Sequence, residues 1–388
     1  MSASEHDAQD VSSTTASTTA STTAPTTAPT TTTPATDSSA AANPGASMTV
    51  HPFNFTGSGS EYFRIWIVNL LLSLLTLGIY SAWAKVRTQR YLHGHTEVAG
   101  GRFEYHGEPI PILIGRVLAI GALIVYVLAS EFSPLAGSLL GLVLIVATPY
   151  IIVRSFRFNA SMSSWRGIRF GFEGSAWDAA GAYLGWPLVG AMTLGLVIPY
   201  AWFKQAAFNV NGHRFGQTPF KFGATPSEFY GLALILGMVT FVLAILFGVL
   251  IGALGGMDVL QTSAPGSLGG PGILLIGLVG LLAYLSLTAL FSGLRFRLIY
   301  GDLELGANWV QNSVSVGRFV FIVVTNTIAM MLTLGLYYPW AKIRMVRFLV
   351  NSVRLEATDL DGFVAATDSE GNAIGEELGS AFDIGIGV

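Results

Sequence analysis

Seven apolar stretches set the strongest limit on the fold, because each approaches the ~20 residues needed to cross the hydrocarbon core of a bilayer. They are residues 65–83, 112–130, 135–153, 179–203, 230–254, 273–294 and 319–340. Only 11% of the 388 residues are charged, whereas soluble proteins carry about 25%. A chain of this composition cannot cover a water-facing surface. The sequence therefore predicts an all-α polytopic membrane protein.

One string of thirteen residues occurs in three related versions. They read "LTLGIYSAWAKVR" at 75–87, "MTLGLVIPYAWFK" at 192–204 and "LTLGLYYPWAKIR" at 332–344. Thr76 aligns with Thr193 at an offset of 117 residues and with Thr333 at an offset of 257, which leaves 140 between the later two copies. The same offsets align aromatic, basic and glycine positions, which apolar composition alone would not do. We therefore predict tandem internal repeats.

The repeats and the changes in composition suggest five regions. These are a Ser/Thr/Ala/Pro-rich leader at 1–50, repeat units at 51–167 and 168–306, a truncated third unit at 307–358 and an acidic tail at 359–388. The leader has almost nothing to bury and is expected to be disordered. The Phe-x-Phe-x-Gly elements "FNFTG" and "FGFEG" alternate apolar and polar residues, which is a strand pattern. We expect short β elements from different copies to pair at the membrane surface.

Basic residues leave two alternatives for the number of crossings. Lys and Arg mark cytoplasmic loops, and they follow the first, third, fourth, sixth and seventh stretches, whereas the connectors 131–134 and 255–272 contain none. The fourth stretch is flanked by basic residues on both sides. Either all seven stretches cross, or the first, fourth and seventh are re-entrant and bend at the glycine of Thr-Leu-Gly. We expect a cytoplasmic C-terminus.

Polar residues inside the apolar stretches are candidates for an intramembrane polar path. In the first stretch they recur at intervals that place them on one helix face. Polar groups at membrane depth face a cavity or another helix, so hydrogen bonds between helices are the alternative. The candidates are Asn69, Ser73, Thr76, Tyr80, Thr193, Asn326, Thr333 and Tyr337.

A second set combines aromatic and basic side chains and is expected to anchor the chain at lipid headgroups. It comprises Trp83, Lys85, Arg87, Arg90, Trp202, Lys204, Trp340, Lys342, Arg344 and Arg347. A specific site for an anionic lipid or a phosphate is the sharper alternative. The sequence has no nucleophile–base pair and no phosphate-cradling Gly-Lys-Ser/Thr. We therefore expect no enzyme activity, catalytic residue, metal or cofactor.

The residues from 52 to 388 resemble the YjgN-like family of bacterial inner-membrane proteins. The resemblance is carried by the start from Phe53 to Phe63, by Asn69, by "TLGIYSAWAKVR" and "GGRFEYHG", and by the ending "GEELGSAFDIGIG". It implies a multi-pass protein of the bacterial inner membrane and supplies no reaction or ligand. A small-solute or ion transporter or channel is the favoured function, and a lipid-interacting or scaffolding protein is the alternative. Membrane lipids are the expected partners and nucleic acid is not, while homo-oligomerisation and the substrate stay open.

Overall fold

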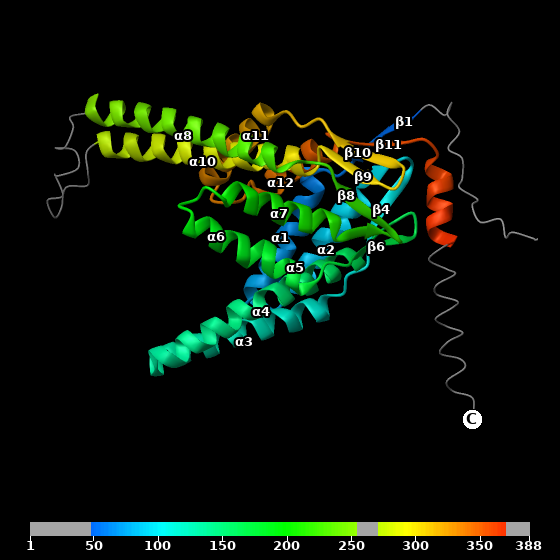
Figure 1. Ribbon diagram of the computed structural model, residues 1–388, viewed down its shortest axis with the longest axis horizontal. Coiled ribbons are helices and arrows are strands. Elements are labelled where there is room, and N and C mark those ends of the chain that lie inside the picture. Colours follow the sequence, from blue (N-terminus) through cyan, green and yellow to red (C-terminus); the bar gives the residue numbers. More distant parts are fainter. Residues whose placement is uncertain (1–47, 254–270, 370–388) are drawn as a thin grey trace, which may run out of the picture. The chain divides into compact units, whose positions relative to one another are not determined.

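A computed structural model describes residues 48–253 and 271–369 (Figure 1). Nearly all of the leader, most of the connector 255–272 and the tail beyond residue 369 lie outside the described residues. The helices are α1 (Gly59–Leu75), α2 (Ser81–Gly94), α3 (Pro109–Phe132), α4 (Pro134–Ser161), α5 (Ala176–Ala180), the π-helix η1 (Gly181–Gly185), α6 (Trp186–Met192), α7 (Ile198–Asn211), α8 (Pro226–Ala253), α10 (Pro271–Ile299), α11 (Val316–Leu332) and α12 (Tyr338–Val350). Residues 360–369 are also helical.

The strands form one antiparallel sheet of eleven members, in the order β1-β11-β10-β9-β8-β7-β6-β5-β4-β3-β2. They are β1 (Thr49–Pro52), β2 (Asn54–Phe55), β3 (Thr96–Val98), β4 (Gly101–Tyr105), β5 (Ser163–Trp165), β6 (Ile168–Phe172), β7 (His213–Phe215), β8 (Thr218–Phe222), β9 (Asp302–Leu305), β10 (Asn308–Asn312) and β11 (Val353–Ala357). Only Phe53 separates β1 from β2, and its N–H donates to the Val353 carbonyl at 3.1 Å. The sheet therefore nearly closes into a barrel.

This sheet corrects the expectation of an all-α protein. Strands from different parts of the chain do pair, but they build a barrel-like sheet rather than small surface elements. Each strand has only two to five residues, so its alternating pattern is weak beside the long apolar stretches. The sheet also continues across the predicted boundaries at 50/51, 167/168 and 306/307. Those boundaries, and internal duplication itself, stay predictions.

Connections at the two edges of the sheet differ. At one edge, two-residue turns such as Ala99-Gly100 and Arg166-Gly167 join neighbouring strands, and all four of these residues have positive φ. This conformation is typical of tight hairpins whose twist matches that of the strands. At the other edge, the strands connect through helices that leave the sheet and return to it: α1–α2, α3–α4, α5–α7, α8–α10 and α11–α12. All the described helical hairpins therefore begin and end at the same edge.

Aromatic side chains fill the inner face of the curled sheet. The first phenylalanines of the Phe-x-Phe elements stack in a row, with ring centroids 6.1 Å apart for Phe53 and Phe103, 6.2 Å for Phe103 and Phe170, and 6.5 Å for Phe170 and Phe220. Phe215 is 1% exposed in the same cluster. A small barrel with its interior packed by side chains is a core and not a pore.

Each Phe-x-Phe-x-Gly element ends in glycine because a larger residue would clash with the preceding aromatic ring. A Cβ atom on Gly57 would lie 2.7 Å from the Phe55 ring, and one on Gly174 would lie 2.6 Å from the Phe172 ring. The second aromatic residue of each element therefore folds over its own glycine. Its ring packs between the sheet and the helix ends, as Phe55 does beside Tyr62 and Tyr91.

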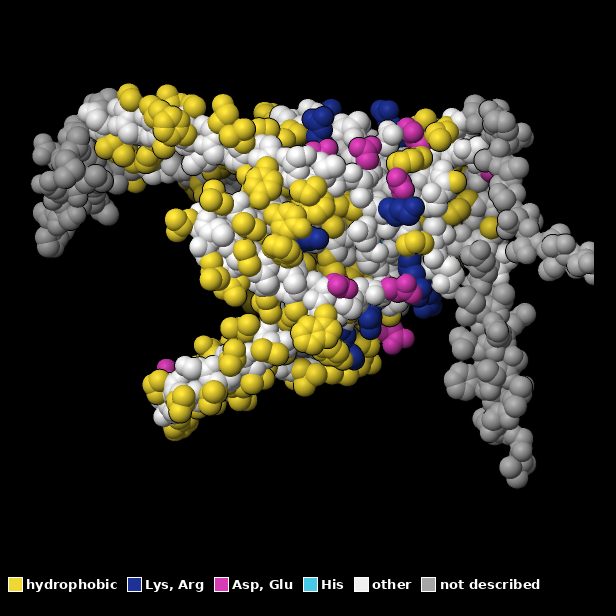
Figure 2. Space-filling view, viewed as in Figure 1, with side chains coloured by type: hydrophobic (Ala, Val, Ile, Leu, Met, Phe, Trp, Pro, Cys, Tyr) yellow, Lys and Arg dark blue, Asp and Glu magenta, His cyan; other side chains and the backbone are white. Residues whose placement is uncertain are grey.

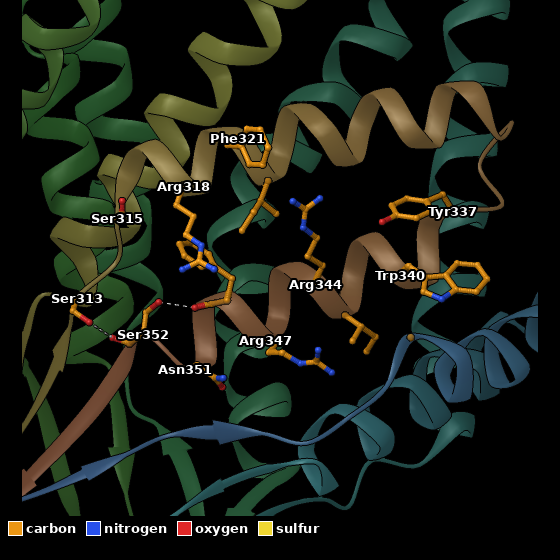
Figure 3. Close-up of a pocket in the computed structure, with 14 residues that line it drawn as sticks. Ser313, Ser315, Arg318, Phe321, Tyr337, Trp340, Arg344, Arg347, Asn351 and Ser352 are labelled. Atoms are coloured by element: carbon orange, nitrogen blue, oxygen red, sulfur yellow. Dashed lines mark hydrogen bonds between the residues drawn. The ribbon is translucent and has the colours of Figure 1, made fainter.

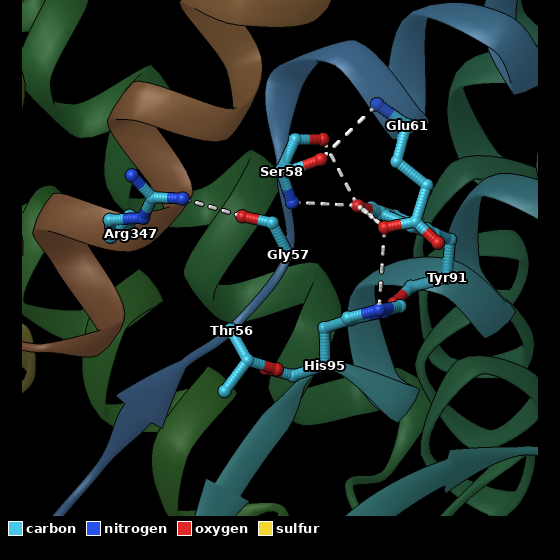
Figure 4. A network of polar contacts seen from close by, with 7 residues as sticks. All are labelled: Thr56, Gly57, Ser58, Glu61, Tyr91, His95 and Arg347. Carbon is cyan, nitrogen blue, oxygen red and sulfur yellow. Dashed lines mark hydrogen bonds and ion pairs between the residues drawn. The ribbon is translucent and has the colours of Figure 1, made fainter.

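Hydrogen bonds hold the closing strand between two distant helices (Figure 4). The Tyr91 hydroxyl of α2 accepts from the Ser58 N–H at 2.9 Å and lies 3.0 Å from the Ser58 carbonyl and 3.1 Å from Glu61 Oε2. From α12, Arg347 Nη2 donates to the Gly57 carbonyl at 2.6 Å. Arg90 and Arg157 donate in the same way to the Gly107 and Gly174 carbonyls. These arginines join the second helix of one hairpin to the strand end before the next.

The helical hairpins are of two lengths. Within the described residues, α3, α4, α8 and α10 are the four helices long and apolar enough to cross a membrane. The first, fourth and seventh apolar stretches instead break at Thr-Leu-Gly, where the leucine has φ of 50–53° and the glycine 88–93°. Gly78 N–H donates to the Ser73 carbonyl at 2.7 Å, which is the bond of a Schellman helix end. Each of these three stretches is therefore two shorter helices joined by a bend, as the re-entrant alternative expects, and the number of crossings stays a prediction.

Candidate functional site

A hollow of about 690 Å³ lies between α11, α12 and the start of α1 (Figure 3). We call it the three-arginine hollow, because Arg318, Arg344 and Arg347 line it. Arg318 comes from the first turn of α11, and the other two come from successive turns of α12. Two of these arginines were predicted as headgroup anchors, whereas Arg318 was not.

Packing positions the three guanidinium groups without neutralising them. Arg344 Nη1 donates to Thr325 Oγ1 at 3.0 Å and to Asn326 Oδ1 at 3.1 Å. The Arg318 guanidinium carbon lies 5.9 Å from the centre of the Phe348 ring. In the part of the chain that the structure describes, no carboxylate forms an ion pair with any of the three. The hollow therefore carries net positive charge.

One helix N-terminus adds to this field. Ser315, whose side chain does not cap the helix, precedes α11. The start of α1 is instead capped by Ser58, whose hydroxyl accepts from the Glu61 N–H. The free N–H groups at a helix start attract anions. Ser313, Asn351 and Ser352 complete the polar wall. Guanidinium groups form charge-assisted hydrogen bonds to phosphate and carboxylate, so the hollow is suited to binding an anion.

Aromatic rings line the hollow on the side of the hairpin tip. Trp340 stacks on Phe63 with ring centroids 4.9 Å apart and on Tyr337 at 6.1 Å. A Cβ atom on Gly59 would lie 2.5 Å from the indole of Trp340, so glycine is required where α1 passes this ring. Tyr337, predicted for a polar path, lines the three-arginine hollow.

An aligned hollow between α5 and α7 provides an internal comparison, because its lining residues lie 140 positions earlier. Asp178 stands where the later copy has Arg318, Lys204 where it has Arg344, and Ala207 where it has Arg347. Glu173 lines this hollow as well. Glu173 is ion-paired with Arg214, which leaves one carboxylate and one lysine in the lining. The two hollows therefore share a position in the fold, but only the later one has an excess of positive charge. This aligned position is the signal by which Arg318 could have been found from the sequence.

The hydroxyls of the three threonines in the Thr-Leu-Gly strings form hydrogen bonds within the turns. Each hydroxyl donates to the carbonyl four residues earlier and accepts from the N–H four residues later. The donating distances are 2.7 Å for Thr76, 2.9 Å for Thr193 and 2.7 Å for Thr333. The accepted N–H groups belong to Tyr80, Val197 and Tyr337.

The other predicted path residues separate into different surroundings. Asn326 is buried, and its Nδ2 donates to the Ala341 carbonyl at 3.1 Å. Asn69 and Ser73 line a second hollow, and neither polar atom of the Asn69 side chain has a partner there. Tyr80 stacks on Trp83 with ring centroids 6.1 Å apart. The structure does not bring the predicted set together into one continuous path.

The remaining predicted anchors also have separate roles. Trp202 packs on Phe291 of α10 with ring centroids 4.9 Å apart. Lys85 and Lys342 line the second hollow, and the side chain of Lys204 lies 5.4 Å from the Tyr200 ring. Arg87 is exposed. Apolar side chains cover the outer parts of the helices, whereas charged ones gather where helices meet the sheet (Figure 2).

Comparisons with known proteins identify relatives of the chain. Residues 50–381 match the family described as "Bacterial protein of unknown function (DUF898)". The chain is 26% identical over 373 residues to "Inner membrane protein YjgN" of Salmonella typhimurium strain LT2, covering 82% of this chain and 92% of that protein. It is 38% identical over 126 residues to the protein of the same name in Escherichia coli K12, covering 32% and 31% of the two chains. No solved structure matches it.

Proposed function

The chain belongs to the DUF898 family of bacterial proteins, and from that membership we propose that it is an inner-membrane protein that binds the anionic headgroup of a lipid. The names of its relatives and its four long apolar helices support the membrane location. The three-arginine hollow is the proposed headgroup site. Its chemistry supports a phosphate-bearing group as the ligand.

The proposed topology places the sheet on the cytoplasmic side. Two hairpins, α3–α4 and α8–α10, cross the bilayer, and the even number of crossings returns the chain to one side. Arg154 and Arg157 lie near the sheet-proximal end of α4, and Arg295 and Arg297 lie near that of α10. Positively charged residues near the ends of spanning helices favour the cytoplasm. The segment after β11 starts at the turn edge of the sheet, which is consistent with a cytoplasmic C-terminus.

One observation carries the proposal: the charge reversal at the aligned first-turn position. Glu61 of α1 and Asp178 of α5 are acidic, as the positive end of a helix dipole favours. At the same position α11 has Arg318, which the dipole disfavours. A bound anion would interact favourably with the dipole, with Arg318 and with both arginines of α12. Without such a ligand, this arrangement is electrostatically unfavourable.

The surroundings of the hollow favour a lipid over a solute in transit. The tip of the α11–α12 hairpin exposes Leu332 and Leu334, at 80% and 94%. Acyl chains attached to a headgroup in the hollow would lie along this apolar tip. In contrast, the predicted path residues do not lie together. In each of the four long helices, at most 17% of the residues in an 18-residue apolar segment are buried. Transport along the predicted path is therefore not supported.

The test is lipid binding by the full chain and by R318E, measured by native mass spectrometry from detergent micelles with added phosphatidic acid or phosphatidylcholine. R318E restores the acidic residue of the aligned helices and should fold normally. We expect phosphatidic acid to bind R318E roughly 10–100-fold more weakly, the range of one charge-assisted hydrogen bond. K204Q, in the aligned hollow between α5 and α7, is the matched control. Equal binding of phosphatidic acid by R318E and the unaltered chain would refute the proposal.

A further inference from the structure

A second hollow of about 610 Å³ lies between α1, α2 and α12. We call it the Asn69 hollow. Two lysines line it, Lys85 and Lys342, and none of its lining residues is acidic. Lys342 Nζ lies 5.6 Å from the Tyr62 ring centre and 5.8 Å from that of Tyr338. Within the described chain, neither lysine forms an ion pair with a carboxylate.

Asn69 is the unusual member of this lining. It is 4% exposed, and neither its Oδ1 nor its Nδ2 has a hydrogen-bond partner among the described residues. Leaving a buried polar group unpaired costs about 1–3 kcal/mol. Both atoms are almost inaccessible in this side-chain position, so a ligand in the hollow that Asn69 lines would bond to them once the amide turns toward it.

The aligned asparagine shows that an unpaired side-chain amide is not a general property of these hairpins. Asn326 lies 257 positions later and has both partners, since it donates to the Ala341 carbonyl and accepts from Arg344. The residues at the corresponding earlier positions are Ala84 and Arg87, and Asn69 bonds to neither. The same residue is therefore paired within the protein in one hairpin and unpaired beside a hollow in the other.

The lining groups define the chemistry of a ligand. Two lysines require negative charge, and they act as point charges that suit phosphate. An amide that must both donate and accept is matched by an alcohol hydroxyl, which does the same. Ser73, Ser81, Thr88 and Gln89 add further hydroxyl and amide groups. The lining thus offers both cations and neutral hydrogen-bonding groups.

We propose that the Asn69 hollow binds a polyol phosphate, a phosphate group carried beside alcohol hydroxyls. The lysines bind the phosphate, and Asn69 exchanges hydrogen bonds with a hydroxyl. This chemistry occurs in the headgroup of phosphatidylglycerol and in soluble glycerol phosphate. The hollow also contacts Leu70 and Met330, which lie in apolar helices. The proposal rests on a different hollow from the three-arginine site and does not depend on it.

The experiment compares phosphatidylglycerol, phosphatidic acid and soluble glycerol 1-phosphate on the purified full chain, by native mass spectrometry and by competition. Phosphatidic acid carries the phosphate without the free hydroxyls. In R318E, whose three-arginine hollow is weakened, we expect phosphatidylglycerol to bind about fivefold or more tightly than phosphatidic acid, in keeping with one neutral hydrogen bond. N69L should abolish this preference, whereas the double variant K85Q/K342Q should weaken the binding of both lipids. Competition by glycerol 1-phosphate would identify a soluble source, and no competition would identify the lipid.

Two further variants keep the result decisive. N69D preserves the size of the side chain and should weaken the binding of every anion in the Asn69 hollow. It replaces N69L if that variant does not fold. N326L removes two internal hydrogen bonds and should lose stability, while N69L should not. In the R318E background, an unaltered lipid preference after N69L, or no preference before it, would overturn the proposal. An N69L chain that is only more stable would show that Asn69 contacts water alone, which also overturns it. R318E reports on the other hollow, so the two proposals can fail separately.

Discussion

Replacing Tyr91 with phenylalanine should loosen the contact between α2 and the start of α1. The side chain is 7% exposed, and its hydroxyl bonds to Ser58, the N-cap residue of α1, and to Glu61 at distances of 2.9–3.1 Å (Figure 4). Burial raises the pKa of Tyr91, so the hydroxyl keeps its proton and donates. Y91F removes this donor and leaves the Ser58 N–H without its acceptor.

The expected cost follows from these two bonds. A buried donor left unpaired costs about 1–3 kcal/mol, so Y91F should lower the free energy of unfolding by about that amount. The assay is equilibrium unfolding in mixed detergent micelles. Y80F is the matched control, because the structure gives the Tyr80 hydroxyl no hydrogen bond within the described residues and its ring stacks on Trp83. A loss in Y91F no larger than that in Y80F would refute the reasoning.

Three other outcomes are expected from the same unfolding assay. G174A should destabilise by about 1–3 kcal/mol through overpacking, since the added Cβ would lie 2.6 Å from the Phe172 ring; G121A, which meets nothing within 4 Å, should be close to neutral. Burial lowers the pKa of His93, so the neutral form is the folded one and stability should fall as pH drops below the ordinary value of about 6.5. H93Q should reduce this dependence of stability on pH. Because burial also lowers the pKa of His213, part of the dependence should remain. An unchanged dependence in H93Q would contradict the assignment to His93. In the absence of added lipid, R318E should raise stability by about 0.3–1 kcal/mol because it removes a cation from a helix N-terminus, and a loss would contradict the charge argument.

Several features of the site were predictable from local sequence. The Thr-Leu-Gly strings recur at fixed offsets, and all three have the same bend because the helix ending depends on neighbouring residues. The predicted anchors Arg344, Arg347 and Lys342 do line hollows. However, the threonines proposed for a path hold turns, and Arg90 bonds to a carbonyl of the protein. The type and spacing of a residue do not determine which residue it contacts in the folded protein.

The sequence by itself determined the membrane class, because the length of an apolar stretch is a local property that decides whether it can span a bilayer. Only the tertiary structure decided the rest. The closing strand pairs Thr49 with Ala357, 308 residues away, and no local pattern encodes such a partner. The two hollows likewise depend on α1 meeting α12 across that closure. The charge of the hollows and the unpaired amide of Asn69 arise because the closed sheet brings these helices side by side.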